Sequence, residues 1–172
     1  MMKPSLSAAG ILPQAAVLSD SEVQLIDICV RISQFVGLPK SVGEIYGLLF
    51  VSSSPLSLDV VCQKLSLSKG SASQGLKHLR AYGAVKSNYI AGDRRDHYIA
   101  ETDLNTLLNG FLKERIAPGI ADLAERLGRI EEETAKLSPA EQRAAKERLA
   151  QLRQWQRQAA KILPLANTLL GK

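Results

Sequence analysis

Residues 69–82 combine an apolar face with a small, polar and basic one. A serine cap at Ser68 and a glycine stop at Gly83 predict a helix over this range. Its apolar side repeats at helical spacing and consists of Ala72, Leu76 and Leu79. The opposite side carries Gly70, Gln74, Lys77, His78 and Ala81, with Ser71 and Ser73 on its flanks. Serine and glutamine can hydrogen-bond base edges, and lysine can reach a guanine or a phosphate. The helix N-terminus also attracts phosphate.

A charged hairpin follows this helix. Residues 85–90 and 96–100 read as strands, joined by a tip at residues 91–95. Arg94 and Arg95 can reach a minor groove of DNA, and Asp93 can hold one of them in a bidentate pair. Each feature alone also fits a solvated helix face or a charged hairpin end that discourages edge pairing. Their combination favours nucleic-acid binding, with the candidate contacts Lys69, Ser71, Ser73, Gln74, Lys77, His78, Arg94 and Arg95.

The distribution of charge supports this interpretation. The 172 residues carry a formal net charge of +5, from 22 Lys and Arg against 17 Asp and Glu. Residues 58–100 hold seven of the bases and three of the acids, and are the most basic stretch per residue, which points to a polyanion. A composition of 45% hydrophobic and 23% charged residues is typical of a folded soluble protein. No uncharged apolar run reaches the roughly 18 residues that suggest a membrane span.

Three helices are expected before residue 69. The first begins at the capping box Ser19–Glu22 and runs to about Val36, the second begins at Ser41, and Ser57 caps a short third. The second and third of these helices, the helix at 69–82 and the hairpin together make a winged helix-turn-helix domain. The fold class is mainly α (α+β). The expected organisation is a flexible tail at 1–18, an N-terminal dimerisation helix at 19–37, the winged domain at 38–101 and a C-terminal helical dimerisation region at 102–172.

Long helices are expected after Asp103, where apolar residues recur every three or four positions. Pro118 should kink or split the first of them near Ala117, and Pro164 should end or bend the last, which begins at Ser138. Residues 131–133 should be a solvated charge run. The helices at both ends of the chain carry apolar stripes that one winged domain cannot cover, so a homodimer is expected.

The stretch from Phe35 to Glu101 resembles MarR-type winged-helix transcriptional regulators, most closely the GbsR-like subgroup. The resemblance is carried by LSLSKGSASQGLKHLRAYGAV (65–85) and GDRRDHY (92–98). It implies a homodimer joined by its first and last helices, which binds palindromic double-stranded DNA. On the matching positions of this chain, it implies DNA contacts at Ser71, Ser73, Gln74, Lys77, Arg94 and Arg95.

The same resemblance implies an effector pocket between the winged domain and the dimer helices. GbsR-like members that respond to choline or glycine betaine would need an aromatic cage, but this chain has one Trp and few clustered rings. The identity of the effector therefore stays open. Tyr46, Phe50 and Trp155 are the candidate pocket residues. Tyr46 and Phe50 are equally a core pair, and dimer packing is favoured over a pocket wall for Trp155.

No other constellation points to a reaction. Cys29 and Cys62 lie on apolar stripes without an adjacent base, which favours packing over a redox switch. His78 and His97 lack partners at zinc-site spacing, so no metal site is expected. There is no phosphate loop and no Ser/His/Asp arrangement, so we expect no enzyme and no cofactor. Without an export signal, and with two cysteines, a cytoplasmic location is expected.

Two functional hypotheses remain. The first is a sequence-specific, homodimeric DNA-binding repressor relieved by a small-molecule effector. The second is a winged-helix protein–protein interaction module that docks partners through its C-terminal helices. A module of the second kind would not need both a basic helix face and a basic hairpin tip, and the fold alone does not decide between them.

Overall fold

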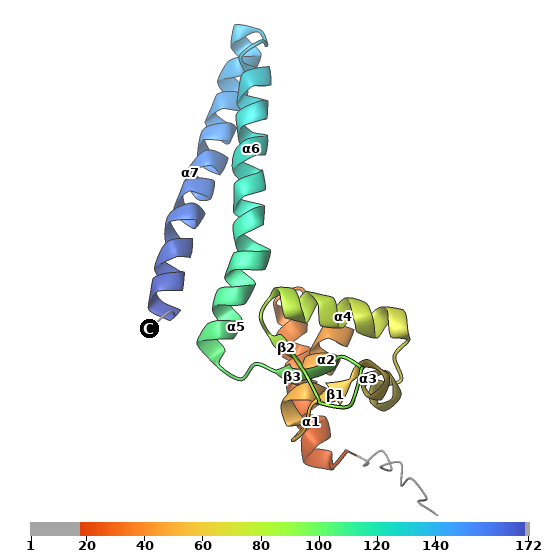
Figure 1. Ribbon diagram of the computed structural model, residues 1–172. Helices are drawn as coiled ribbons and strands as arrows, with labels where there is room; N and C mark the ends of the chain where they lie inside the picture. Colours follow the sequence, from red (N-terminus) through yellow and green to blue (C-terminus); the bar gives the residue numbers. More distant parts are fainter. Residues whose placement is uncertain (1–17, 171–172) are drawn as a thin grey trace, which may run out of the picture.

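The chain folds into a small domain from which a long helical hairpin projects (Figure 1). The computed structural model describes residues 18–170, except for the side chains of residues 144 and 166–170. All of the expected N-terminal tail but Leu18 lies outside the described residues. Within the described part, no helix is long and apolar enough to cross a membrane.

Four helices build most of the small domain: α1 (Asp20–Phe35), α2 (Lys40–Val51), α3 (Leu58–Leu65) and α4 (Lys69–Ala81). Their starts follow the predicted caps. Ser19 and Glu22 form the capping box of α1, and the Ser68 hydroxyl accepts a hydrogen bond of 3.2 Å from the Ser71 amide at the start of α4. Gly83 follows α4 with a φ of +68°, a left-handed conformation that glycine adopts at little cost.

The core lies where α2 packs against α1 on one side and α4 on the other. Ile45 and Leu48 of α2 are almost fully buried, together with Leu76 of α4. Helix α1 buries only Ile26 and Val30 among its apolar residues. A second apolar stripe on α1 remains exposed in the protomer and consists of Leu25, Ile28, Ile32 and Phe35. One apolar side of α1 is therefore covered by α2, and the stripe that one winged domain was predicted to leave uncovered is exposed in the protomer.

The sheet has three strands, one more than predicted. Strands β2 (Val85–Asn88) and β3 (His97–Ala100) form the expected antiparallel hairpin, and β1 (Leu56–Ser57) pairs with the other edge of β3. The predicted strands are each too long, because pairing stops at Asn88 opposite His97 and leaves residues 89–96 as the connecting loop. A two-residue strand such as β1 has no period of its own, so sequence patterning cannot detect it.

The first long helix is interrupted just before Pro118, as predicted. Helix α5 (Leu104–Phe111) continues into a π-helical turn, η1 (Leu112–Ile116), and then into α6 (Ala117–Thr134). The Ala117 amide donates to the Leu112 carbonyl, five residues back. A proline inside a helix lacks a donor and its ring collides with the carbonyl four residues before it, and a widened turn relieves both problems.

Helix α7 (Pro139–Leu170) returns alongside α6 as an antiparallel partner (Figure 1). Its start matches the prediction, because the Ser138 hydroxyl and amide both donate to the Glu141 carboxylate. The prediction that Pro164 could end this helix is wrong, because α7 continues through Pro164 to Leu170. A proline removes one hydrogen bond, and a helix with several turns already formed can continue past that loss.

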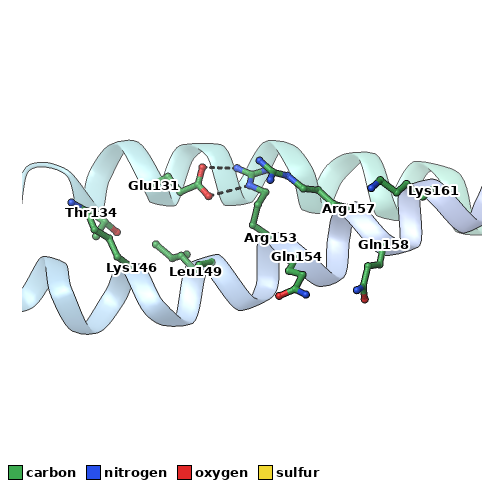
Figure 2. Close-up of a pocket in the computed structure, with 10 residues that line it drawn as sticks. Glu131, Thr134, Lys146, Leu149, Arg153, Gln154, Arg157, Gln158 and Lys161 are labelled. Atoms are coloured by element: carbon green, nitrogen blue, oxygen red, sulfur yellow. Dashed lines mark hydrogen bonds and ion pairs between the residues drawn. The ribbon is translucent and has the colours of Figure 1, made fainter.

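An ion pair fastens α7 to α6. Arg153 donates to the Glu131 carboxylate through Nε and Nη2, at 3.0 and 2.6 Å (Figure 2). Its Nη1 donates to the Ala124 carbonyl at 3.0 Å. The prediction that residues 131–133 are only a solvated charge run is therefore wrong for Glu131, because a residue 22 positions later supplies its partner. The pair sits in a groove of about 730 Å³ between the two helices.

Helix α5 packs directly against the C-terminal end of α4. A Cβ atom added to Gly110 would lie 1.8 Å from the Tyr82 carbonyl oxygen, so only glycine permits this approach. The neighbouring Phe111 ring meets Tyr82 edge-on, with centroids 6.0 Å apart. The helical hairpin therefore begins from a contact with the last residue of the α4 region.

This contact predicts that Gly110→Ala destabilises the protein. The new methyl group must push α5 away from backbone atoms, which we expect to cost about 1–3 kcal/mol in the free energy of unfolding. Gly119→Ala in α6 is the matched control, since a Cβ there has nothing within 4 Å. Removing a helical glycine at that open position should raise stability by roughly 0.5–1 kcal/mol. Urea unfolding of both variants measures the difference, and equal stabilities would contradict the close approach.

Candidate nucleic-acid interface

Helix α4 presents the predicted polar face to solvent. Its apolar side is buried, with Ala72, Leu76 and Leu79 each at most 4% exposed. Lys69, Gly70, Ser73, Gln74 and Lys77 are exposed, and Ser71 and His78 are half-buried. The orientation is fixed by Gly75, where a Cβ would come within 2.5 Å of Cδ1 of Ile45. The predicted polar face is therefore available to a partner of the winged domain.

The N-terminal end of α4 is tied to α3. Nζ of Lys69 lies 2.8 Å from the Asp59 carboxylate. Hydrogen bonding within this pair lowers the pKa of Asp59 and raises the pKa of Lys69. Both side chains are more than half exposed, so the pair contributes little to stability. Asp59 therefore partly neutralises the charge of Lys69 in the absence of a bound anion. The sequence did not reveal this pair.

Gln74 and His78 form a small polar cluster one helical turn apart. Nε2 of Gln74 lies 3.4 Å from Nε2 of His78. The His78 ring stacks on Tyr82, with ring centroids 6.4 Å apart. Tyr82 in turn contacts Phe111 of α5, so the imidazole is supported from the side of the long hairpin. Support of this kind limits the rotamers of a side chain that faces a ligand.

The hairpin tip holds one arginine and leaves the other free of ion pairs. Arg95 donates through Nε to the Asp93 carboxylate at 2.9 Å and through Nη2 at 2.5 Å, and its amide also donates to Asp93 at 3.0 Å. These bonds lower the pKa of Asp93 far below its usual range. The predicted bidentate pair is confirmed, and Arg95 is the arginine that it holds. Arg94 is exposed and makes no ion pair with residues 18–170.

The buried His97 contacts two residues of the hairpin tip. His97 is 6% exposed, and its Nδ1 lies 3.0 Å from the carbonyl oxygen of Arg95. Its Nε2 lies 3.5 Å from the Asp93 carboxylate. The tip is therefore connected to β3 on two sides, which limits the positions open to the Arg95 guanidinium.

The base of the hairpin is anchored at Glu101. The Glu101 carboxylate pairs with Lys86 of β2 and accepts hydrogen bonds from the amides of Thr102 and Asp103, at 2.9 and 3.0 Å. Lys86 and these amides lower the pKa of Glu101 to about 2. The Tyr46 hydroxyl donates to the Glu101 carbonyl at 2.7 Å, and burial raises the pKa of Tyr46 to about 12. Helix α2, the sheet and the start of the long hairpin meet at this residue.

The three predicted effector-pocket residues do not meet in one protomer. The Tyr46 and Phe50 rings lie together on α2, with centroids 6.0 Å apart. Trp155 lies on α7, in the hairpin that projects away from α2, and is 65% exposed. Tyr46 also has a structural hydrogen bond to Glu101. A pocket containing all three residues would require a second chain.

The structure adds residues that the sequence analysis did not select. A hollow of about 640 Å³ lies between α4 and the start of β3, lined by Ser73, Lys77, Arg80, Asp96 and Tyr98 among others. Ser73, Lys77 and Arg80 follow one another at helical spacing, which could have marked Arg80 as part of the same side. Asp96 and Tyr98 join them only through the fold.

The two cysteines are free thiols. Cys29 and Cys62 are both unpaired and half-buried. Burial raises the pKa of the Cys29 thiol, which disfavours the reactive thiolate. Among the residues described, no group of three or more histidine, cysteine or acidic side chains is placed to hold a metal ion.

Comparison with a solved structure identifies the architecture. The crystal structure of a transcriptional regulator superposes with a TM-score of 0.66, over 88% of this chain and 96% of that one, at 17% sequence identity. The small domain is a winged helix. At this level of identity the likeness establishes the fold. A mutant of S. aureus MepR bound to an oligodeoxyribonucleotide overlaps less well, with a TM-score of 0.41 over 77% of this chain and 89% of that one, at 17% identity.

Sequence comparison finds a GbsR protein. The HTH-type transcriptional repressor GbsR of Bacillus subtilis (strain 168) is 28% identical over 99 residues. The match covers 58% of this chain and 54% of GbsR, so this winged-helix chain aligns with about half the length of that relative. It confirms the GbsR-like resemblance that the sequence motifs indicate. No model of a known protein family matches the chain.

The anchoring of Glu101 predicts a specific acid dependence. Since the folded state lowers its pKa, the stabilisation is present above the unfolded-state pKa of about 4.3 and is lost as the pH falls toward 2. Glu101→Gln should therefore lower the melting temperature at pH 7, and the difference from the unmodified protein should shrink between about pH 4.5 and 2. Glu132→Gln, at an exposed carboxylate on α6, is the control. A difference that stays constant down to pH 2.5 would contradict this role.

Proposed function

We propose that this chain is a sequence-specific DNA-binding transcriptional regulator that acts as a homodimeric repressor in the cytoplasm. Helix α4 reads the major groove, and the tip at residues 91–95 reaches the adjacent minor groove. The observation that carries the proposal is the pairing of an exposed polar face on α4 with an arginine held rigidly at the hairpin tip. The similarity to GbsR, which is named as a repressor, supports it.

The roles of the contact residues follow from their surroundings. Ser71, Ser73 and Gln74 provide hydroxyl and amide groups for base edges, and Gln74 suits an adenine. Lys69, Lys77 and His78 lie at the ends and flank of this face and suit phosphates. Arg95, fixed by Asp93, presents a preformed guanidinium to the minor groove, while Arg94 is free to follow the backbone.

Fluorescence anisotropy tests this proposal, using duplexes tiled across the DNA upstream of the protein's own gene at two salt concentrations. One duplex should bind far more tightly than the rest, and its affinity should fall as salt rises. Gln74→Ala should cost about 1–3 kcal/mol of discrimination between the best duplex and its base-substituted variants. Arg94→Ala should weaken binding to all duplexes alike and reduce the salt slope by about one per phosphate contact.

The opposite results are equally informative. If neither variant changes binding to the best duplex, the assigned roles are wrong. Equal and weak binding to every duplex would favour the alternative function, a protein–protein interaction module. The observation behind that alternative is the exposed apolar stripe on α7, which includes Leu152, Trp155, Ile162 and Leu165.

Dimerisation is the second part of the proposal. The exposed stripe on α1 and the exposed stripe on α7 are both large apolar surfaces of the kind that a partner subunit covers. Two winged domains held in this way can address the two halves of a palindromic site. An effector pocket that combines Tyr46 and Phe50 with Trp155 also requires the second protomer.

Ile32→Glu tests the α1 stripe. A charge in the middle of an apolar interface should dissociate the dimer, so the mass from light scattering should fall from twice 18.7 kDa to 18.7 kDa. Affinity for the best duplex should fall with it, because each protomer then binds one half-site alone. Gln34→Glu adds the same charge to an exposed position of α1 outside the stripe and should leave the dimer intact. Dissociation by neither variant would remove the α1 stripe from the interface, and dissociation by both would show that the effect does not depend on the stripe.

A further inference from the structure

The hollow between α4 and the start of β3 has two cations and one carboxylate in its lining. Ser73, Lys77 and Arg80 line it from α4, and Asp96 and Tyr98 line it from the strand side. Arg80 is three residues after Lys77 and seven after Ser73, so all three side chains project from one side of the helix. That side faces β3, whereas Gln74 lies on the outermost face.

The cations of this hollow differ from most of their neighbours. Lys69, Lys86 and Arg95 are each paired with a carboxylate. Lys77 and Arg80 are exposed, and neither forms an ion pair with any residue between 18 and 170. Asp96 lines the same hollow but forms no ion pair with either cation, so both remain able to bind an anion.

The geometry of duplex DNA supplies that anion, if the proposed function holds. A major groove and the minor groove next to it are separated by one sugar–phosphate backbone. With α4 in the first groove and the hairpin tip in the second, this backbone must cross the surface between α4 and the strands. The hollow lies on that surface.

We propose that the hollow binds a phosphodiester of the backbone between the two grooves. Arg80 is the principal ligand, because its planar guanidinium matches two phosphate oxygens. Lys77 adds a second positive charge to the site. The inference rests on the proposed function and adds Arg80 to the contacts expected from the sequence.

Asp96 restricts where a phosphate can lie in the hollow. It lines the hollow together with the α4 cations, and its negative charge repels a phosphate that moves toward the strand side. The backbone is thereby confined to the α4 side, which helps to fix the register of α4 in its groove. The repulsion lowers the total affinity, so removing it should tighten binding.

The test uses the full chain and the best duplex from the tiling experiment, together with one unrelated duplex. Arg80→Gln keeps the aliphatic stem and removes the charge. In a dimer it should weaken binding roughly ten- to hundredfold on both duplexes alike and reduce the salt slope by about two, one phosphate contact in each protomer. Asp96→Asn should tighten binding by about two- to fivefold. Circular dichroism melting curves establish that both variants are folded.

Lys136→Ala is the matched control. It also removes one positive charge, but from the turn between α6 and α7, at the far end of the hairpin from α4 (Figure 1). The inference is overturned if Arg80→Gln behaves like Lys136→Ala, or if Asp96→Asn fails to tighten binding. The inference is also overturned if Arg80→Gln weakens binding to the best duplex alone, because a contact to phosphate does not depend on the base sequence. If the unmodified protein shows no salt-dependent DNA binding, the proposed function itself fails, which is a separate outcome.

Discussion

The packing of α4 against α2 is the contact on which the interface depends. Gly75 lies so close to Ile45 that no larger residue fits without displacement, and Ala72, Leu76 and Leu79 are buried beside it. An α-helix with one face fixed has its other face fixed as well, since side chains 100° apart cannot reorient independently. The outward position of Gln74 and Lys77 is therefore a consequence of the core, and any partner of this face meets a rigid surface.

The hairpin is held to this core by polar contacts. Glu101 joins β2, α2 and the first long helix through Lys86, the Tyr46 hydroxyl and two backbone amides. Asp93 and His97 hold the tip around Arg95. Charged groups with several partners have narrow positional freedom, which suits the proposed contact with two neighbouring DNA grooves. The end of α4 contacts the long hairpin directly, through Tyr82 against Gly110 and Phe111. A movement of that hairpin would therefore act directly on the end of α4.

Much of the local structure was predictable because it depends on residues three or four positions apart. The serine caps of α1, α3 and α4, the glycine after α4, the split before Pro118 and the exposed face of α4 all follow from such spacings. The bidentate Asp93–Arg95 pair is also local, because its residues are two positions apart. The hairpin was found but its strands were drawn too long, because alternation in the sequence does not reveal where cross-strand pairing stops.

The amino-acid sequence by itself determined the helix starts, the polar face of α4 and the charged tip, since these rest on short-range hydrogen bonds and on the helical period. Only the tertiary structure decided which charges pair across separate parts of the fold. Asp59 with Lys69, Glu101 with Lys86 and Glu131 with Arg153 lie on different elements. Tertiary packing also produces the strand β1, the close contact of Gly110 with Tyr82 and the hollow beside Arg80. Each depends on how separate elements pack, and the packing is set by buried apolar shape, which no local pattern encodes.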